Sequence, residues 1–165
     1  MKTIDTTKPI VRSLDIYLAD DDDADCQLFE KALKELPVTA NLTTFMDGEE
    51  LLYTLSQAGH IMPDVLFLDL NMPRKNGFVA LGQIKRDEKL YDLPVIVFST
   101  ANDQAKVKTV FRDAAHYYIT KPAKFSDLKE VIYKALTIIA EGNIQLPKQE
   151  NFVIASDIKV ANDEI

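Results

Sequence analysis

Five short apolar runs alternate along this chain with five segments in which apolar residues recur every three or four positions. The runs have the length and aliphatic content of strands that are buried on both faces, and the periodic segments are typical of amphipathic helices. Strands that alternate with helices in this way are joined by right-handed crossovers, which makes the strands parallel and places helices on both faces of the sheet. The sequence therefore predicts an α/β protein with a five-stranded parallel sheet.

Each predicted strand is defined by an apolar run and each predicted helix by apolar residues on one face. We expect strands over residues 15–20, 39–46, 65–70, 94–99 and 116–120. We expect helices near residues 22–36, 51–55, 78–87, 103–115 and 126–141. Pro37 and Gly142 stand where the first and last helices should end, because proline cannot continue a helix and glycine readily adopts the left-handed conformation beyond a helix end.

The composition is that of a globular protein with one hydrophobic core. At 165 residues, with 47% apolar and 27% charged residues, the chain is long enough for one full domain and too short for two ordinary ones. No apolar stretch approaches the roughly 20 residues that cross a bilayer, and residues 1–13 lack the apolar core of a signal peptide. We therefore expect no membrane span and a cytoplasmic location.

Charge and cysteine content argue against two functions. The net charge is −7, and no cluster of lysine and arginine is dense enough to follow a phosphodiester backbone, so we expect no direct DNA binding. The single Cys26 can form no internal disulfide. Its helical spacing with Phe29 and Leu33 is typical of a small apolar residue rather than of a nucleophile.

Polar side chains follow four of the predicted strands. Asp20, Asp69, Ser99 and Lys121 each lie at or just after the carboxyl end of a strand. In parallel α/β sheets, ligands bind outside these ends, at the point where the strand order reverses. We therefore expect these four residues, which are far apart in the sequence, to gather at one edge of the sheet.

The acids at this edge predict a divalent metal site. Asp20, Asp21 and Asp69 would repel one another on convergence unless a cation or a phosphoryl group stood between them. Carboxylate oxygens, together with a phosphate oxygen and water, suit Mg²⁺. A carboxylate beside Mg²⁺ can attack a phosphoryl group to form an aspartyl phosphate, with Lys121 as the neutralising cation and the Ser99 hydroxyl as a hydrogen-bond donor to the attached group.

Each motif also has an ordinary structural interpretation when taken alone. The acidic run from Asp20 to Asp23 suits a solvated helix N-terminus, and Asn71-Met72-Pro73 suits a turn. Ser99-Thr100 suits a helix start, and Lys121-Pro122 suits a loop. Their joint occurrence at matching strand ends favours one functional site over four unrelated features.

As a set, the motifs resemble those of a response-regulator receiver domain of the CheY-like type. The resemblance rests on Asp20-Asp21, on Leu68-Asp69-Leu70-Asn71-Met72-Pro73 with Gly77, on Ser99-Thr100, and on Tyr118-Ile119-Thr120-Lys121-Pro122. It implies a flavodoxin-like, doubly wound (βα)5 fold with the strand order 2-1-3-4-5.

The resemblance divides the chain into three parts. Residues 14–141 match the receiver domain, residues 1–13 form an N-terminal lead, and residues 142–165 form a tail that we expect to be mostly mobile. Within the tail, Phe152, Val153 and Ile154 form a short apolar island. We expect this island to dock either on the domain or on a partner.

The resemblance implies that Asp69 accepts a phosphoryl group beside a bound Mg²⁺. The ligands of this ion would be Asp20, Asp21, Asp69 and the backbone carbonyl of Asn71. The donor would be a sensor histidine kinase or a phosphotransfer protein. The chain would be no enzyme beyond self-catalysed phosphoryl transfer onto its own aspartate and slow autodephosphorylation.

The resemblance also implies a switch. Ser99 would bind the attached phosphoryl group, Lys121 would pair with it, and Tyr118 would turn inward when Ser99 moves. The Lys-Pro bond is commonly cis in this family, so we expect a cis bond between Lys121 and Pro122. Ala101 stands where many members carry a charged or amide side chain that influences hydrolysis, which leaves the lifetime of the phosphoryl group open.

Phosphorylation would change the surface formed by the fourth helix, the fifth strand and the fifth helix. Basic residues are relatively abundant there, among them Lys106, Lys108 and Arg112. As a stand-alone single-domain regulator, the protein would act on a downstream protein target through this surface. Homodimerisation through the same surface is a hypothesis.

Two other functions compete with this one. A Mg²⁺-dependent phosphohydrolase of the haloacid-dehalogenase type also uses a strand-end aspartate, but it needs a second aspartate two residues later as acid and base. Here that position is Asn71, whose amide cannot exchange protons. A phosphorylation-independent, receiver-like adaptor is the other alternative, but such modules typically lose one of the site residues, and here the set is complete.

Overall fold

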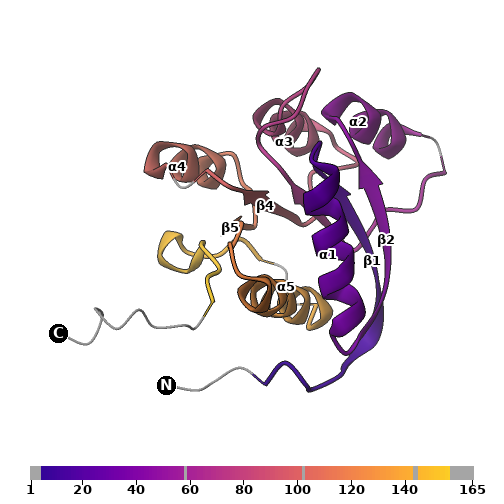
Figure 1. Ribbon diagram of the computed structural model, residues 1–165. Coiled ribbons are helices and arrows are strands. Elements are labelled where there is room, and N and C mark those ends of the chain that lie inside the picture. The colour runs from indigo at the N-terminus through magenta and orange to yellow at the C-terminus, as the bar shows by residue number, and fades with distance from the viewer. Residues whose placement is uncertain (1–4, 58, 102, 143–144, 157–165) are drawn as a thin grey trace.

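The structure of the protein is a computed structural model that describes residues 5–57, 59–101, 103–142 and 145–156 (Figure 1). The strands are β1 (Ile10–Ala19), β2 (Val38–Phe45), β3 (Val65–Leu68), β4 (Val95–Ser99) and β5 (Tyr117–Thr120). The helices are α1 (Asp23–Glu35), α2 (Gly48–Ser56), α3 (Gly77–Arg86), α4 (Gln104–Arg112) and α5 (Phe125–Ala140), followed by a short 3-10 helix, η1 (Gln149–Asn151). None of the described helices has the length and apolar content required to cross a bilayer.

The five strands form one sheet in the order β2-β1-β3-β4-β5, and each neighbouring pair is parallel. The order reverses between β1 and β3, because the chain first adds β2 on one side of β1 and then continues on the other side. This reversal is the point at which doubly wound sheets bind ligands. The predicted flavodoxin-like α/β fold and its strand order are confirmed.

The sheet separates two apolar clusters. On one face, α1 and α5 contribute buried residues such as Phe29 and Leu136. On the other face, α2, α3 and α4 contribute Leu51, Leu81 and Val110. Every residue of β3 and β4 is buried, as expected for central strands covered on both sides. These two strands read as continuous apolar runs in the sequence for that reason.

The first strand begins earlier than the sequence indicated. We assigned residues 10–13 to the N-terminal lead, but β1 starts at Ile10, whose N–H donates to the carbonyl of Pro37 over 2.9 Å. The register between β1 and β2 shifts between Ile10 and Leu14. Residues 11–13 are exposed, and Val11 is 96% exposed, so no buried run marks this part of the strand in the sequence.

Part of the tail packs against the outer strand of the sheet. We call residues 148–155 the C-terminal strap. In Figure 1 the strap is the yellow segment beside β5, close to α4 and α5. Phe152 is 1% exposed and Ile154 is 8% exposed, so two of the three apolar residues of the predicted island dock on the domain itself.

Candidate functional site

Three aspartates meet at the carboxyl edge of the sheet. Asp20 and Asp21 follow β1, Asp69 follows β3, and one carboxylate oxygen of each lies within 4.8 Å of the other two. Asp20 is fully buried and Asp69 is 5% exposed, whereas Asp21 is open to solvent. Oxygen donors grouped in this way, with one side open to water, fit a divalent metal ion that prefers oxygen ligands.

Main-chain hydrogen bonds place two of these carboxylates side by side. The N–H of Asp20 donates to the carbonyl of Phe45 at the end of β2 over 2.9 Å. The N–H of Asp69 donates to the carbonyl of Ala19 at the end of β1, also over 2.9 Å. The strand pairing thus continues one residue past β1 and β3, which brings together the two residues that the sequence placed at the same edge.

The acidic run from Asp20 to Asp23 combines both interpretations that the sequence left open. Asp22 is the N-cap of α1, and its carboxylate accepts from the N–H of Asp25 over 3.1 Å. The carboxylate of Asp23 accepts from the side-chain amide of Gln27. The second half of the run therefore serves the helix, as such acids commonly do. The first half, Asp20 and Asp21, forms the carboxylate cluster together with Asp69.

Gly77 lets α3 begin directly against the loop that holds Asp69. A Cβ atom at this position would lie 2.2 Å from the carbonyl oxygen of Asp69 and 2.8 Å from the Cα of Leu70. Both distances are far shorter than van der Waals contact, and both atoms belong to the backbone. A side chain at Gly77 would therefore displace the main chain at Asp69, which carries the carboxylate.

Lys121 joins the cluster from the loop after β5. Its ammonium group lies 2.6 Å from Oδ2 of Asp20, 2.8 Å from Oδ2 of Asp25 and 3.5 Å from Oδ2 of Asp69. The side chain is 9% exposed, so these charge-assisted bonds lie mostly out of water. One cation thus neutralises a group of acids that would otherwise repel one another.

Asp25 belongs to the site although the sequence analysis did not assign it. It lies in the first turn of α1, where acidic residues ordinarily complement the positive end of the helix. Helical periodicity gives no signal for its role, because Asp21 lies before the N-cap Asp22 and therefore shares no helical face with Asp25. The bond to Lys121 itself depends on the packing of α1 beside α5.

The charges of Asp20 and Lys121 are mutually dependent. Burial raises the pKa of Asp20 to about 6, although hydrogen bonds from Lys121 and from the N–H of Asp22 oppose the increase. Burial also lowers the pKa of Lys121, but its hydrogen bonds with Asp20 and Asp25 outweigh that effect and hold the pKa above its ordinary value. Lys121 is therefore a permanent cation in this site.

Ser99 and Tyr118 are linked through the loop that follows β4. The N–H of Ala101 donates to Oγ of Ser99 over 3.3 Å, and the hydroxyl of Tyr118 donates to the carbonyl of Ala101. Ser99 and the ring of Tyr118 are both fully buried. The N–H of Lys121 donates to the carbonyl of Ser99 over 2.8 Å, so the loops after β4 and β5 are joined beside the carboxylates.

Two expectations about the loops have different outcomes. The N–H of Asn71 donates to Oδ1 of Asp69 over 3.3 Å, so this residue does contact the carboxylate. The expected cis bond between Lys121 and Pro122 is wrong, because the described residues contain no cis peptide bond. A trans bond is the preferred form of an X-Pro peptide by about 0.5–1 kcal/mol, and the loop accommodates it.

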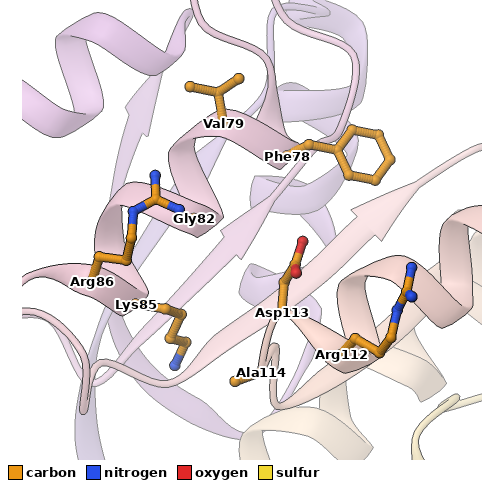
Figure 2. A pocket seen from close by; sticks show the side chains of 8 residues that line it. All are labelled: Phe78, Val79, Gly82, Lys85, Arg86, Arg112, Asp113 and Ala114. Atoms are coloured by element: carbon orange, nitrogen blue, oxygen red, sulfur yellow. The ribbon is translucent and has the colours of Figure 1, made fainter.

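A separate hollow of about 510 Å³ lies between α3 and the C-terminal end of α4 (Figure 2). Figure 2 shows Arg86 and Arg112 on opposite sides of it, with Asp113 between them. Basic residues in the last turn of a helix complement its negative end, which accounts for both arginines. The hollow shares no residue with the carboxylate cluster.

The carboxylates, rather than a histidine or the cysteine, are the candidate nucleophiles of this site. His60 contacts the hydroxyl of Tyr17, and His116 accepts from the N–H of Val95, so both histidines are engaged elsewhere. Burial raises the pKa of the Cys26 thiol to about 11, which keeps it protonated. The arrangement suits an attack by a carboxylate on an electrophile that brings its own leaving group.

One protein family matches most of this chain. The response regulator receiver domain family matches residues 16–133. Response regulator Rcp1 from Synechocystis sp. is 30% identical over 121 residues, which cover 71% of this chain and 82% of Rcp1.

Solved structures agree with this match. The Mn(2+)-bound form of Rcp1 superposes with a TM-score of 0.71 at 28% identity and covers 82% of this chain and 99% of that one. The phosphorylated cyanobacterial phytochrome response regulator RcpA superposes with a TM-score of 0.71 at 32% identity and covers 83% of this chain and all of that one.

Proposed function

This chain belongs to the response regulator receiver domain family, and from that premise we propose that it is a phosphoacceptor regulator of a two-component or phosphorelay system. The phosphorylated residue is Asp69. The observation that carries the proposal is the ammonium group of Lys121, which is shared between the buried carboxylates of Asp20 and Asp69 at the switch point of the sheet. Receiver domains are signalling switches, and the shared cation supports the same role for this chain.

In the proposed reaction, a carboxylate oxygen of Asp69 attacks the phosphorus of a phosphohistidine. The P–N bond breaks, the imidazole leaves with its electron pair, and an acyl phosphate forms on Asp69. The donor is a sensor histidine kinase or a phosphotransfer protein. Lys121, whose ammonium group lies 3.5 Å from Asp69, neutralises charge on the transferred oxygens.

The proposed metal ion is Mg²⁺. Its protein ligands are the carboxylates of Asp20, Asp21 and Asp69 and the backbone carbonyl of Asn71. When bound, Mg²⁺ reduces the repulsion between the acids and the incoming phosphoryl group. Three oxygen donors within 4.8 Å of one another support this assignment, and so does the manganese ion of the Rcp1 structure, since manganese(II) also favours oxygen ligands.

The proposed switch begins at Ser99. Its hydroxyl donates to the phosphoryl group on Asp69, which draws the loop after β4 toward the site. Tyr118 follows this loop, because its hydroxyl is bonded to the carbonyl of Ala101. The surface of α4, β5 and α5 then changes shape and charge distribution, and a downstream protein target binds there.

Homodimerisation through the same surface remains part of the proposal. The C-terminal strap lies along β5 on this surface, and Val153 is 48% exposed there. A second copy that docked on this face would therefore contact the strap. Direct DNA binding and membrane insertion are not part of the proposed function, and the cytoplasmic location stays a prediction.

The two competing functions have less support. A phosphohydrolase of the haloacid-dehalogenase type lacks its acid-base aspartate here, because the position two residues after Asp69 is Asn71. A phosphorylation-independent adaptor does not need the Lys121 contacts with three carboxylates. The proposed catalysis is limited to phosphoryl transfer onto Asp69 and its slow loss.

Intact mass spectrometry tests this function. The purified protein is incubated with acetyl phosphate and Mg²⁺, beside an Asp69→Asn variant and a sample with the metal removed. We expect one added phosphoryl group in the wild type and none in either control. Uptake by Asp69→Asn would contradict the assignment of Asp69. No uptake by wild type, either from acetyl phosphate or from cognate kinases, would favour the adaptor.

A further inference from the structure

The C-terminal strap occupies the hydrogen-bonding groups at the outer edge of the sheet. The N–H of Tyr118 donates to the carbonyl of Phe152 over 3.0 Å, and the N–H of Ile154 donates to the carbonyl of Tyr118 over 2.8 Å. These bonds make a parallel bridge between Tyr118 and Val153. An edge strand otherwise leaves such groups to solvent or to another chain. The strap therefore binds β5 specifically at Tyr118.

Two apolar side chains anchor the strap, one on each face of the sheet. Phe152 packs on the face covered by α4, where its ring centroid lies 5.1 Å from that of Phe111 and 6.4 Å from that of Tyr118. Ile154 joins the apolar cluster on the face covered by α5. Val153, between them, is 48% exposed. The side chains of residues 152 and 154 thus pack on opposite faces of the sheet, and the main chain of the strap is hydrogen-bonded to Tyr118 at its edge.

Tyr118 connects this contact to the carboxylate site. Its main chain holds the strap, and its hydroxyl donates to the carbonyl of Ala101. The N–H of Ala101 in turn donates to Oγ of Ser99 over 3.3 Å. The same residue is therefore bonded to the strap on one side and to the Ser99 loop on the other.

Phe152 also limits where the ring of Tyr118 can lie. Tyr118 is fully buried and Phe152 is 1% exposed, so the two rings are enclosed in one packed region. Protein interiors contain few voids, and a ring cannot leave such a region unless its neighbours move. The docked strap therefore favours the buried position of Tyr118 and the hydrogen bond to Ala101 that goes with it.

We propose that the C-terminal strap is an intramolecular latch, docked on the edge of β5, that holds Tyr118 buried and thereby stabilises the phosphorylated form of the protein. This inference rests on the phosphoacceptor function proposed above. Docking of the strap and phosphorylation of Asp69 favour the same arrangement of Tyr118 and the Ser99 loop. The two events are therefore coupled, and the coupling is reciprocal. The docked strap raises the affinity of the site for a phosphoryl group, and phosphorylation tightens the strap.

Variants of the full chain test the latch. Phe152→Ala removes the aromatic anchor, Phe152→Leu keeps an apolar side chain at the same position, and Val153→Ala changes the exposed neighbour as the matched control. Thermal unfolding establishes that each variant is folded. Each protein is titrated with beryllofluoride in the presence of Mg²⁺, because this anion mimics a phosphoryl group on an aspartate.

We expect Phe152→Ala to weaken beryllofluoride binding by about fivefold or more, the lower end of usual coupling between sites. Phe152→Leu should recover much of this loss, and Val153→Ala should match the wild type. Hydrogen–deuterium exchange gives the second measurement. Beryllofluoride should slow the exchange of the amides of Tyr118 and Ile154 in the wild type. The same amides should exchange faster in Phe152→Ala than in the wild type.

The outcomes separate this proposal from the function on which it rests. A wild type that binds neither beryllofluoride nor a phosphoryl group would overturn both. Suppose that the wild type and Phe152→Ala bind beryllofluoride equally well, while the strap amides exchange faster in Phe152→Ala. This result would overturn the latch and leave the phosphoacceptor function intact. Tighter binding by Phe152→Ala would also overturn it, because the strap would then oppose phosphorylation.

Discussion

The ammonium group of Lys121 donates a 2.8 Å hydrogen bond to the carboxylate of Asp25 and thereby joins the loop after β5 to the first turn of α1. The same ammonium group lies 3.5 Å from Asp69. Lys121 is thus held closer to Asp25 than to the proposed phosphoacceptor. Asp25 is 31% exposed, so water can replace Lys121 as its partner when a phosphoryl group arrives.

Replacement of Asp25 by asparagine should therefore favour the phosphorylated state. The variant loses one competitor for Lys121 and one negative charge near the phosphoryl group. A partly exposed ion pair contributes up to about 1 kcal/mol, so the gain in affinity should be up to about fivefold. We expect Asp25→Asn to bind beryllofluoride more tightly than the wild type in an equilibrium titration. Asp23→Asn is the matched control, because this first-turn acid contacts Gln27 instead. Weaker binding by Asp25→Asn would mean that Asp25 supports Lys121 in the bound state.

Mg²⁺ should stabilise the folded protein through the carboxylate cluster. A metal that binds only the folded state at ten times its Kd adds about 1.4 kcal/mol to the free energy of unfolding. We expect this increment in urea unfolding of the wild type, and a chelator should remove it. Asp20→Asn should abolish the increment, whereas Asp103→Asn, which changes the N-cap of α4, should leave it unchanged. An equal increment in Asp20→Asn would place the metal elsewhere.

Acidification should destabilise the protein through His116. Burial lowers the pKa of this imidazole to about 4, so between pH 6.5 and 4 the unfolded chain binds a proton that the folded protein does not. The contribution of His116 to stability is present above pH 6.5 and is lost as the pH falls, by about 2 kcal/mol between pH 7 and 5.

Urea unfolding of His116→Asn and wild type at both pH values measures this contribution. The asparagine variant should lose less stability on acidification than the wild type. The raised pKa of Asp20 acts in the opposite direction, because its folded form binds the extra proton, but this effect is common to both proteins and cancels in the comparison. Equal losses in wild type and His116→Asn would contradict the prediction.

Two glycines of α3 should respond differently to alanine. A Cβ at Gly77 would lie 2.2 Å from the carbonyl oxygen of Asp69, so Gly77→Ala should lower the free energy of unfolding by about 1–3 kcal/mol and weaken Mg²⁺ binding. A Cβ at Gly82 would meet the movable end of Arg86 at 3.1 Å. Gly82→Ala should therefore leave stability unchanged or raise it by up to about 1 kcal/mol, because alanine favours the helix. Thermal unfolding and Mg²⁺ titration of both variants check this contrast.

The hydrophobic pattern predicted the central elements of the fold well. Residues 65–68 and 95–99 are buried on both faces, so the strands they form appear in the sequence as apolar runs, interrupted only by Ser99 at the end of the second. The pattern failed at residues 10–13, where main-chain bonds extend β1 although Ile10 is only partly buried and residues 11–13 are exposed. Periodicity reports side-chain burial, and it cannot detect strand pairing in a segment whose side chains are mostly exposed.

The candidate site was likewise predicted only in part from the sequence. The positions of Asp20, Asp69, Ser99 and Lys121 at strand ends are local facts, and parallel topology alone brings them to one edge. The sequence thus determined the fold class and most residues of the carboxylate site. Only the tertiary structure decided that Asp25 shares Lys121 and that Phe152 packs beside Tyr118. Both contacts join segments distant in sequence, and such contacts depend on how helices and tail pack around the sheet, which no local pattern encodes.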